Sequence, residues 1–116
     1  MATNLISAST VQALSESFAI ASAYGIPAES FISAVSGNAC GSALAAMKLP
    51  TMVEGDYETH FSLDNMLKDA NIAMTLAKSA ALRTPGIEAT AGVMQGLCDN
   101  GSAGLDYSAL YRQFEK

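Results

Sequence analysis

The segment FSLDNMLKDANIAMTLAK, residues 61–78, decides the fold class because its apolar residues recur with the period of an α-helix. Ser62 can cap the first turn, and Asp64 would interact favourably with the positive end of the helix dipole. We expect one helix that buries a continuous stripe and runs to about Leu82. The stripe consists of Leu63, Met66, Leu67, Ala70, Ala73, Met74, Ala77 and Ala81.

Helical signals also dominate the rest of the chain, and no segment alternates polar and apolar residues as a half-buried strand does. We therefore predict an all-α single domain over residues 1–116, with five to six helices and long first and central helices. The other helices are expected over residues 3–24, 27–37, 84–101 and 106–116. A short helix is expected from Ser42 to Met47, with Pro50 as its stop signal.

Glycines occur in two notable places, a glycine-rich segment between helices and a pair on one helix face. The segment SGNACGS, residues 36–42, is glycine-rich, but no strand precedes it and the chain has no G-x-G-x-x-G motif. A turn between helices is the favoured interpretation. Gly92 and Gly96 lie four residues apart on one helix face, where another helix is expected to approach closely.

Charge is sparse and unevenly distributed. Only 15% of the residues are charged, and the net charge of −5 disfavours a broad nucleic-acid interface. No run reaches the roughly 18 apolar residues of a membrane helix, and no basic segment suggests a signal peptide. The cytoplasm is therefore the expected location. Residues 1–53 carry only three charges, on Glu16, Glu29 and Lys48.

The first helix has two apolar stripes, which indicates that it is covered on two sides. Cover on the second side would come from the rest of the domain or from another chain, so self-association through this helix is expected. One stripe consists of Val11, Leu14, Phe18 and Ala21, and the other consists of Ile6, Ala13 and Ile20.

No residue pattern predicts a metal site. Cys40 and Cys98 lack zinc-ligand spacing, and two reduced, packed thiols are favoured over a disulfide. The acidic run at residues 54–58 lacks the length and the closing Glu of a calcium loop, so a solvated loop is favoured. His60, the only histidine, is expected to be an exposed loop residue rather than an acid–base catalyst.

Lys68 is the best candidate for a ligand-binding residue, although its sequence context allows two interpretations. Asp64 precedes it by four residues, which favours a surface ion pair worth about 0.3–0.5 kcal/mol. An ammonium group in a cleft would instead bind a carboxylate or a phosphate as a point charge. Periodicity alone favours the ion pair and does not separate the two.

Four segments, taken in order along the chain, together resemble one known unit. It is the C-terminal helical domain of the β-hydroxyacid dehydrogenases, the family of 3-hydroxyisobutyrate dehydrogenase and tartronate semialdehyde reductase. The related 6-phosphogluconate dehydrogenases have His where Thr3 stands here, so that branch is disfavoured. The segments are NLISASTVQALSESFAIASAYGIP (4–27), SGNACGSALAAMKLPTMVEGDY (36–57), FSLDNMLKDANIAMTLAK (61–78) and GLDYSALYRQFEK (104–116).

The resemblance implies that two domains have separate roles. In the family an N-terminal Rossmann domain holds NAD or NADP, and that domain is absent from these 116 residues. The family's catalytic lysine would fall one position before Met1. The resemblance implies that Asn4 binds the substrate and that Lys68 and Phe61 lie near the cofactor. Asn4, with Thr3, would also suit a helix N-cap, which alone would explain its presence.

Two hypotheses from different classes follow. The resemblance implies an NAD(P)-dependent oxidoreductase domain that contributes substrate contacts, nicotinamide-side contacts and dimerisation for a small β-hydroxyacid. It further implies that this chain alone is inactive and binds the cofactor weakly or not at all. The alternative is a helical self-association module without chemistry, which the charge-poor first half supports on its own.

Overall fold

The computed structural model describes residues 2–115, which form five α-helices, one π-helical turn and a final 3-10 helix. No strand occurs within these residues, so the prediction of an all-α domain with five to six helices is confirmed. The elements are α1 (Ala2–Ala23), α2 (Ala28–Ser36), α3 (Ala43–Glu54), α4 (Leu63–Ser79), α5 (Pro85–Leu97), η1 (Cys98–Ser102) and η2 (Tyr107–Phe114).

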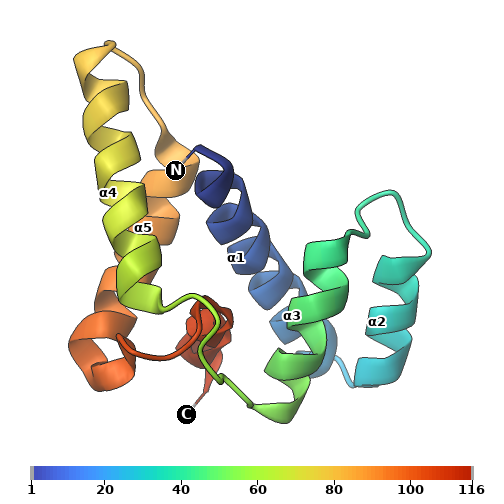
Figure 1. Cartoon of the computed structure of the whole chain (residues 1–116). Helices are drawn as coiled ribbons and strands as arrows, with labels where there is room; N and C mark the ends of the chain where they lie inside the picture. The colour runs from blue at the N-terminus through green and yellow to red at the C-terminus, as the bar shows by residue number, and fades with distance from the viewer. Residues whose placement is uncertain (1, 116) are drawn as a thin grey trace.

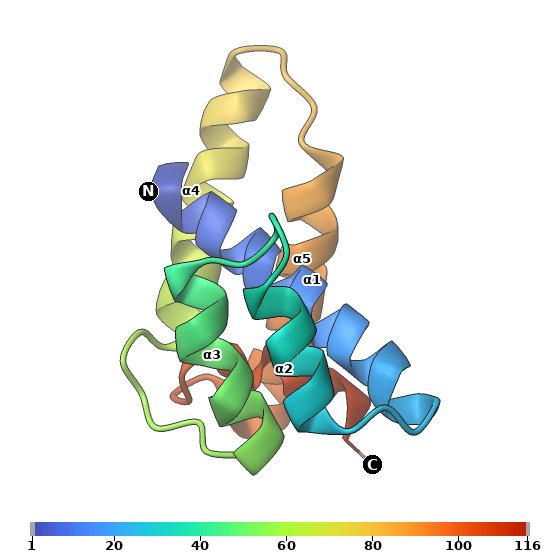
Figure 2. The same ribbon diagram turned by 90° about the vertical axis from the view of Figure 1, so that its right-hand side faces the viewer.

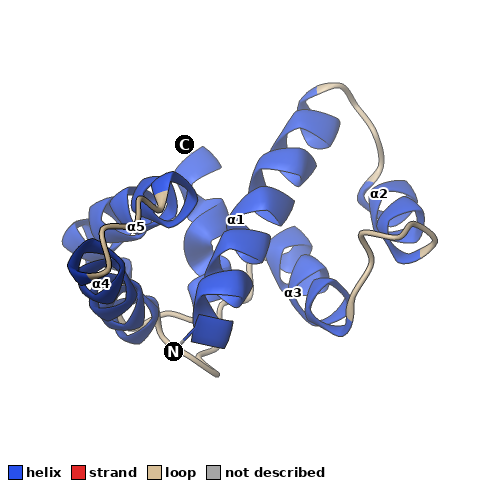
Figure 3. Cartoon of the chain, turned by 90° about the horizontal axis from the view of Figure 1, so that it is seen from above, coloured by secondary structure: helices blue, strands red, loops and turns tan. Residues whose placement is uncertain are grey.

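Helix α1 runs through the middle of the molecule, between a pair formed by α4 and α5 and a pair formed by α2 and α3 (Figure 1, Figure 3). Both pairs pack against α1. A view turned by 90° shows α2 and α3 in front of α1 (Figure 2). The terminal helix η2 contacts α1, α3, α4 and α5, so the end of the chain joins the two sides.

Only one of the two predicted stripes of α1 is covered. Val11 and Phe18 belong to the buried core, together with the other residues of their stripe. Ile6 and Ile20, in contrast, are 68% and 64% exposed, and Ala13 is exposed as well. The described residues therefore cover only one of the two stripes, and cover of the second by another chain, the other source that the pattern allows, stays a prediction.

Helix α3 continues through Pro50, which the sequence analysis took as a stop signal. Proline removes one backbone donor from the helix, but Leu49 and Met52 on either side of it are buried in the core. Burial of this apolar face outweighs the lost hydrogen bond. The helix instead ends at Gly55, whose φ of 69° gives the left-handed conformation that terminates many helices.

Helix α4 ends at Ser79, three residues earlier than expected, and its predicted stripe is buried only up to Ala70. Further along the stripe, Ala73, Met74 and Ala77 are only partly buried, and the end of α4 extends past the start of α1 (Figure 1). Ala81 is exposed and has a φ of 59°, which breaks the helix. Gly92 and Gly96 of α5 face open space, so the expected close helix contact is not made within this chain.

The residues that follow α5 return to the loop before α4. Asp106 caps the final helix, because its side chain accepts a hydrogen bond from the Ser108 N–H at 3.0 Å. The helix that follows is a 3-10 helix rather than an α-helix. Ser62 and Asp106 form an isolated antiparallel bridge, and the Leu63 N–H donates to the Leu105 carbonyl at 2.8 Å.

Within residues 2–115, no helix combines the length and the apolar composition that crossing a bilayer requires.

Replacing Leu49 by alanine should lower the free energy of unfolding by about 2–5 kcal/mol, because the side chain is 1% exposed in the core. Leu76 is the matched control, since it also lies in a helix but is 57% exposed. We expect Leu76→Ala to change stability by less than about 0.5 kcal/mol. Urea denaturation followed by circular dichroism measures both, and equal losses would contradict the described core.

Candidate functional site

Asn4 lies in the first turns of α1 and contacts α4. Its side-chain amide donates a hydrogen bond to Asp69 Oδ2 at 2.6 Å. Because α1 already begins at Ala2, Asn4 stands inside the helix, and the alternative interpretation as an N-cap is wrong. Hydrogen bonds to a carboxylate are stronger than neutral ones. The bond therefore fixes the amide and leaves Oδ1 able to accept a hydrogen bond from a ligand.

Lys68 is exposed on α4, next to Asp69 in sequence. It lines a shallow surface hollow whose other walls also come from this helix, including Asp64, Asn71 and Thr75. Among residues 2–115, the Lys68 ammonium forms no hydrogen bond and no ion pair with Asp64. Asp64 instead accepts a hydrogen bond from the Ser62 hydroxyl at the start of α4. The predicted surface pair is therefore not formed.

Phe61 lies immediately before the N-cap of α4 and is half-buried. Its ring is perpendicular to that of Tyr107, with centroids 6.3 Å apart. Its backbone N–H donates to Asp106 Oδ1 at 3.0 Å, and its carbonyl accepts the Tyr107 N–H at 2.9 Å. Phe61 is therefore fixed both through its backbone and through its ring.

Helix α4 links the three residues that the resemblance assigns to the site. Asn4 is bonded to Asp69, the neighbour of Lys68, and Phe61 precedes the same helix by two residues. Successive helix residues are rotated by about 100°, so Lys68 and Asp69 point to different sides. Lys68 makes no hydrogen bond to Asn4 or Phe61 in the described part of the chain. The three residues thus lie on or next to the N-terminal half of α4, and the hollow beside Lys68 includes neither Asn4 nor Phe61.

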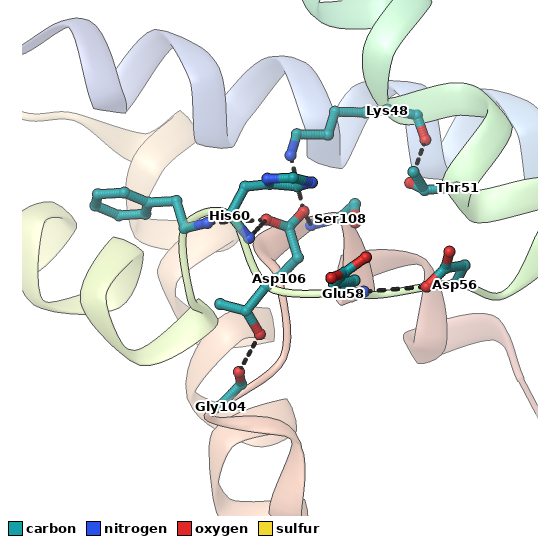
Figure 4. A network of polar contacts seen from close by, with 10 residues as sticks. Lys48, Thr51, Asp56, Glu58, His60, Gly104, Asp106 and Ser108 are labelled. Atoms are coloured by element: carbon teal, nitrogen blue, oxygen red, sulfur yellow. Dashed lines mark hydrogen bonds and ion pairs between the residues drawn. The ribbon is translucent and has the colours of Figure 1, made fainter.

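The other candidate residues are found in simple structural settings. His60 is an exposed loop residue, as expected. The carboxylate of Asp56 accepts the Glu58 N–H at 3.3 Å and so shapes the acidic loop (Figure 4). Cys40 and Cys98 are free thiols, and Cys40 is exposed rather than packed because it sits in the turn between α2 and α3.

The sequence analysis missed a buried ion pair between α3 and the start of η2. Lys48 Nζ lies 2.9 Å from Asp106 Oδ2, and the two side chains are 3% and 2% exposed. The same ammonium lies 4.7 Å from the centre of the Tyr107 ring. The only sequence signal was that Lys48 is the sole Lys or Arg before Lys68, in a largely apolar helix.

Asp106 accepts hydrogen bonds from three parts of the chain (Figure 4). Oδ1 accepts the N–H groups of His60 and Phe61, and Oδ2 accepts Lys48 and the Ser108 N–H. Burial by itself raises the pKa of this carboxyl. The hydrogen bonds from Lys48, Phe61 and Ser108 outweigh burial and lower the pKa from 3.8 to about 2. Asp106 is therefore ionised at neutral pH.

Comparison with known proteins places this fold in one family. The family model described as "NAD-binding of NADP-dependent 3-hydroxyisobutyrate dehydrogenase" matches residues 1–114. The chain is thus a helical domain of the NAD(P)-dependent oxidoreductases. More narrowly, it belongs to the 3-hydroxyisobutyrate dehydrogenase family and corresponds to the C-terminal helical domain, as the resemblance implied.

Two curated relatives from Arabidopsis thaliana are similar in sequence. A probable mitochondrial 3-hydroxyisobutyrate dehydrogenase is 27% identical over 96% of this chain and 34% of its own length. A chloroplastic glyoxylate/succinic semialdehyde reductase 2 is 28% identical over 92% of this chain and 30% of its own length. The chain therefore spans about a third of the relatives that it matches.

Two solved structures share the fold. The 3-hydroxyisobutyrate dehydrogenase of Salmonella typhimurium aligns with a TM-score of 0.90 and 22% identity, over 96% of this chain and 39% of that chain. The Mycobacterium tuberculosis 3-hydroxyisobutyrate dehydrogenase with L-serine aligns with a TM-score of 0.89 and 21% identity, over 99% of this chain and 42% of that chain.

The pKa of Asp106 predicts a specific loss of stability in acid. Its folded value of about 2 lies below the ordinary 3.8, so the ionised Asp106, with all of its hydrogen bonds, contributes about 2 kcal/mol above pH 4. This contribution is lost as the pH falls from about 4 through about 2. The free energy of unfolding should fall more steeply with acid in the wild type than in Asp106→Asn. Urea denaturation across this range measures the slopes.

Asp56→Asn serves as the control, because Asp56 lies on the exposed loop before α4 and has no cationic partner among the described residues. It should keep the wild-type slope. A wild-type slope in Asp106→Asn would contradict the assignment of the acid dependence to the Lys48 pair.

Proposed function

We propose that this chain is the substrate-side and self-association domain of an NAD(P)-dependent oxidoreductase for a small β-hydroxyacid, of the 3-hydroxyisobutyrate or tartronate semialdehyde class. The observation that carries the proposal is the amide of Asn4, held by Asp69 next in sequence to Lys68, which has no ion-pair partner among residues 2–115. The relatives' names support this substrate class, because they describe a 3-hydroxyisobutyrate dehydrogenase and a semialdehyde reductase.

Asn4 would orient the substrate. Its Nδ2 group is committed to Asp69, so its Oδ1 is presented in one direction and can accept the hydroxyl proton of a hydroxyacid. A fixed acceptor costs little entropy on binding and places the reacting carbon reproducibly. Asp69 would act through Asn4 and would not touch the substrate.

Lys68 and Phe61 would form the cofactor side. Bound NAD(P) supplies hydride acceptance and donation, which no amino-acid side chain supplies. The residues present suit such a ligand. The exposed ammonium of Lys68 has no protein partner among residues 2–115 and can bind a phosphate or carboxylate as a point charge. The half-buried ring of Phe61 offers apolar surface to a planar ring.

The reaction also needs a proton acceptor and a cofactor fold, which we propose come from a Rossmann domain that carries the catalytic lysine. The relatives support this arrangement, since this chain matches about a third of their length. The helical chain would then contribute one wall of a cleft whose other wall is the cofactor domain.

In an enzyme that joins this chain to such a Rossmann domain, Lys68→Ala should lower NAD(P)-linked turnover at least tenfold, about 1.4 kcal/mol of transition-state stabilisation. The physical reason is the loss of a positive charge from the cofactor side of the cleft. Lys78→Ala is the matched control, because Lys78 is also exposed on α4 but lies ten residues further along.

Steady-state kinetics with a hydroxyacid as substrate measure kcat and KM for both variants. We expect Lys78→Ala to keep the wild-type kcat/KM. Unchanged turnover in Lys68→Ala, or equal losses in both variants, would remove the proposed role of Lys68.

The second part of the proposal is that the chain self-associates through α1. A helical module without catalytic activity would be expected to self-associate in the same way. The outward face of α1 exposes Ile6 and Ile20 at 68% and 64%, and Tyr24, which directly follows α1, is 86% exposed. Phe114 of η2 borders the same groove as Ile20 and Tyr24 and is itself exposed. An apolar surface of this kind is typical of a protein interface. A second copy of the chain would cover it.

Gel filtration with light scattering should therefore show a dimer or higher oligomer at high micromolar concentration. Ile20→Glu should shift the protein towards the monomer, because it places a charge in the apolar groove. Ile72→Glu is the control, since Ile72 is 40% exposed on α4, away from this groove. A monomeric wild-type protein at that concentration would contradict the proposed interface.

A further inference from the structure

Phe61 is held at three points, and the two residues that hold it are neighbours at the start of η2. Its N–H donates to Asp106 Oδ1 at 3.0 Å. Its carbonyl accepts the Tyr107 N–H at 2.9 Å, and its ring meets the Tyr107 ring at 89°. The position of Phe61 therefore depends on where Asp106 and Tyr107 lie.

Lys48 contacts both of these residues from α3. Its Nζ atom lies 2.9 Å from Asp106 Oδ2 and 4.7 Å from the centre of the Tyr107 ring. Figure 4 shows the ammonium, the Asp106 carboxylate and the backbone of the loop at His60 converging on one point. Because the Lys48 side chain is 3% exposed, water has little access to replace it.

Removal of the ammonium would leave Asp106 as a buried carboxylate without a countercharge. Proteins relieve such a state by protonating the group or by admitting water. Either response weakens the acceptor that holds the Phe61 N–H, since charged acceptors make the stronger hydrogen bonds. Tyr107 would lose the cation over its ring at the same time.

We propose that Lys48 is a positioning residue for Phe61, acting through Asp106 and Tyr107, and that it thereby sets the cofactor side of the cleft. The statement about the cofactor rests on the proposed function, whereas the hold of Lys48 on Phe61 does not. Lys48 lies on α3 and contacts Asp106 and Tyr107. In this role it would touch neither substrate nor cofactor.

Amide hydrogen exchange, measured by NMR on the whole chain, tests whether Lys48 positions Phe61. Lys48→Met removes the charge and keeps a side chain of similar length. We expect exchange at the His60 and Phe61 amides to accelerate at least tenfold, because both donate to Asp106 Oδ1. Amides inside α5 should stay within about twofold of their wild-type rates once corrected for global stability.

Faster exchange confined to His60 and Phe61 supports the proposal. A uniform acceleration at every amide shows that Lys48 serves overall stability alone, and this result overturns the proposal, as does unchanged exchange at Phe61. Lys48→Gln replaces Lys48→Met if the methionine variant does not fold. It removes the charge but keeps an N–H donor on a side chain one atom shorter, so the same local pattern is expected at a smaller size.

The proposal that Lys48 sets the cofactor side of the cleft is tested on the same samples by titration with NAD or NADP. Millimolar concentrations of the nucleotide reveal weak contacts. Amide shifts at Phe61 in the wild type that disappear in Lys48→Met support it, and identical shifts in both overturn it. A wild-type chain without such shifts would speak against the cofactor role of Phe61 in the proposed function. The exchange rates would still decide whether Lys48 holds Phe61.

Discussion

The buried pair of Lys48 and Asp106 is the constraint on which the rest of the structure depends. Two charges removed from water are costly unless every remaining polar atom finds a partner. Here Asp106 accepts four hydrogen bonds, from α3, from the loop before α4 and from η2. The pair therefore adds a polar connection between α3, the loop before α4 and η2. Apolar contacts alone would tolerate small sliding between them, whereas this set of bonds allows one arrangement.

The helices themselves could be predicted because each has a local signal. The residues that bury α4 recur with helical period, and Ser62 and Asp106 are caps whose partners lie two or three residues away. The errors arose where distant residues decide the outcome. Pro50 was expected to end a helix, but burial of Met52 keeps the helix intact. Ile6 and Ile20 have the pattern of a core stripe and yet face outward.

The candidate site was predictable only in part, for the same reason. Asn4 and Lys68 were identified through a resemblance between segments, and their roles stay predictions. The helical spacing predicted an ion pair between Lys68 and Asp64, but Asp64 accepts a hydrogen bond from the Ser62 hydroxyl instead. Lys48 carried no local sign of its partner, because Asp106 lies 58 residues further along the chain. The three successive residues Leu67, Lys68 and Asp69 illustrate the geometry: the first is buried, the second is exposed and the third holds Asn4.

The sequence separation of the ion pair also bears on the order of folding. Ribosomes add about 5–20 residues per second, so Lys48 exists for roughly 3–12 seconds before Asp106 is synthesised. During that time α3 can form, but the lysine has no countercharge and would remain in water. The side of the domain that contains α2 and α3 can therefore dock fully only after the last dozen residues have been made. A nascent chain that stops short of Asp106 therefore lacks the partner of Lys48, although α3 can already pack against α1 and α2.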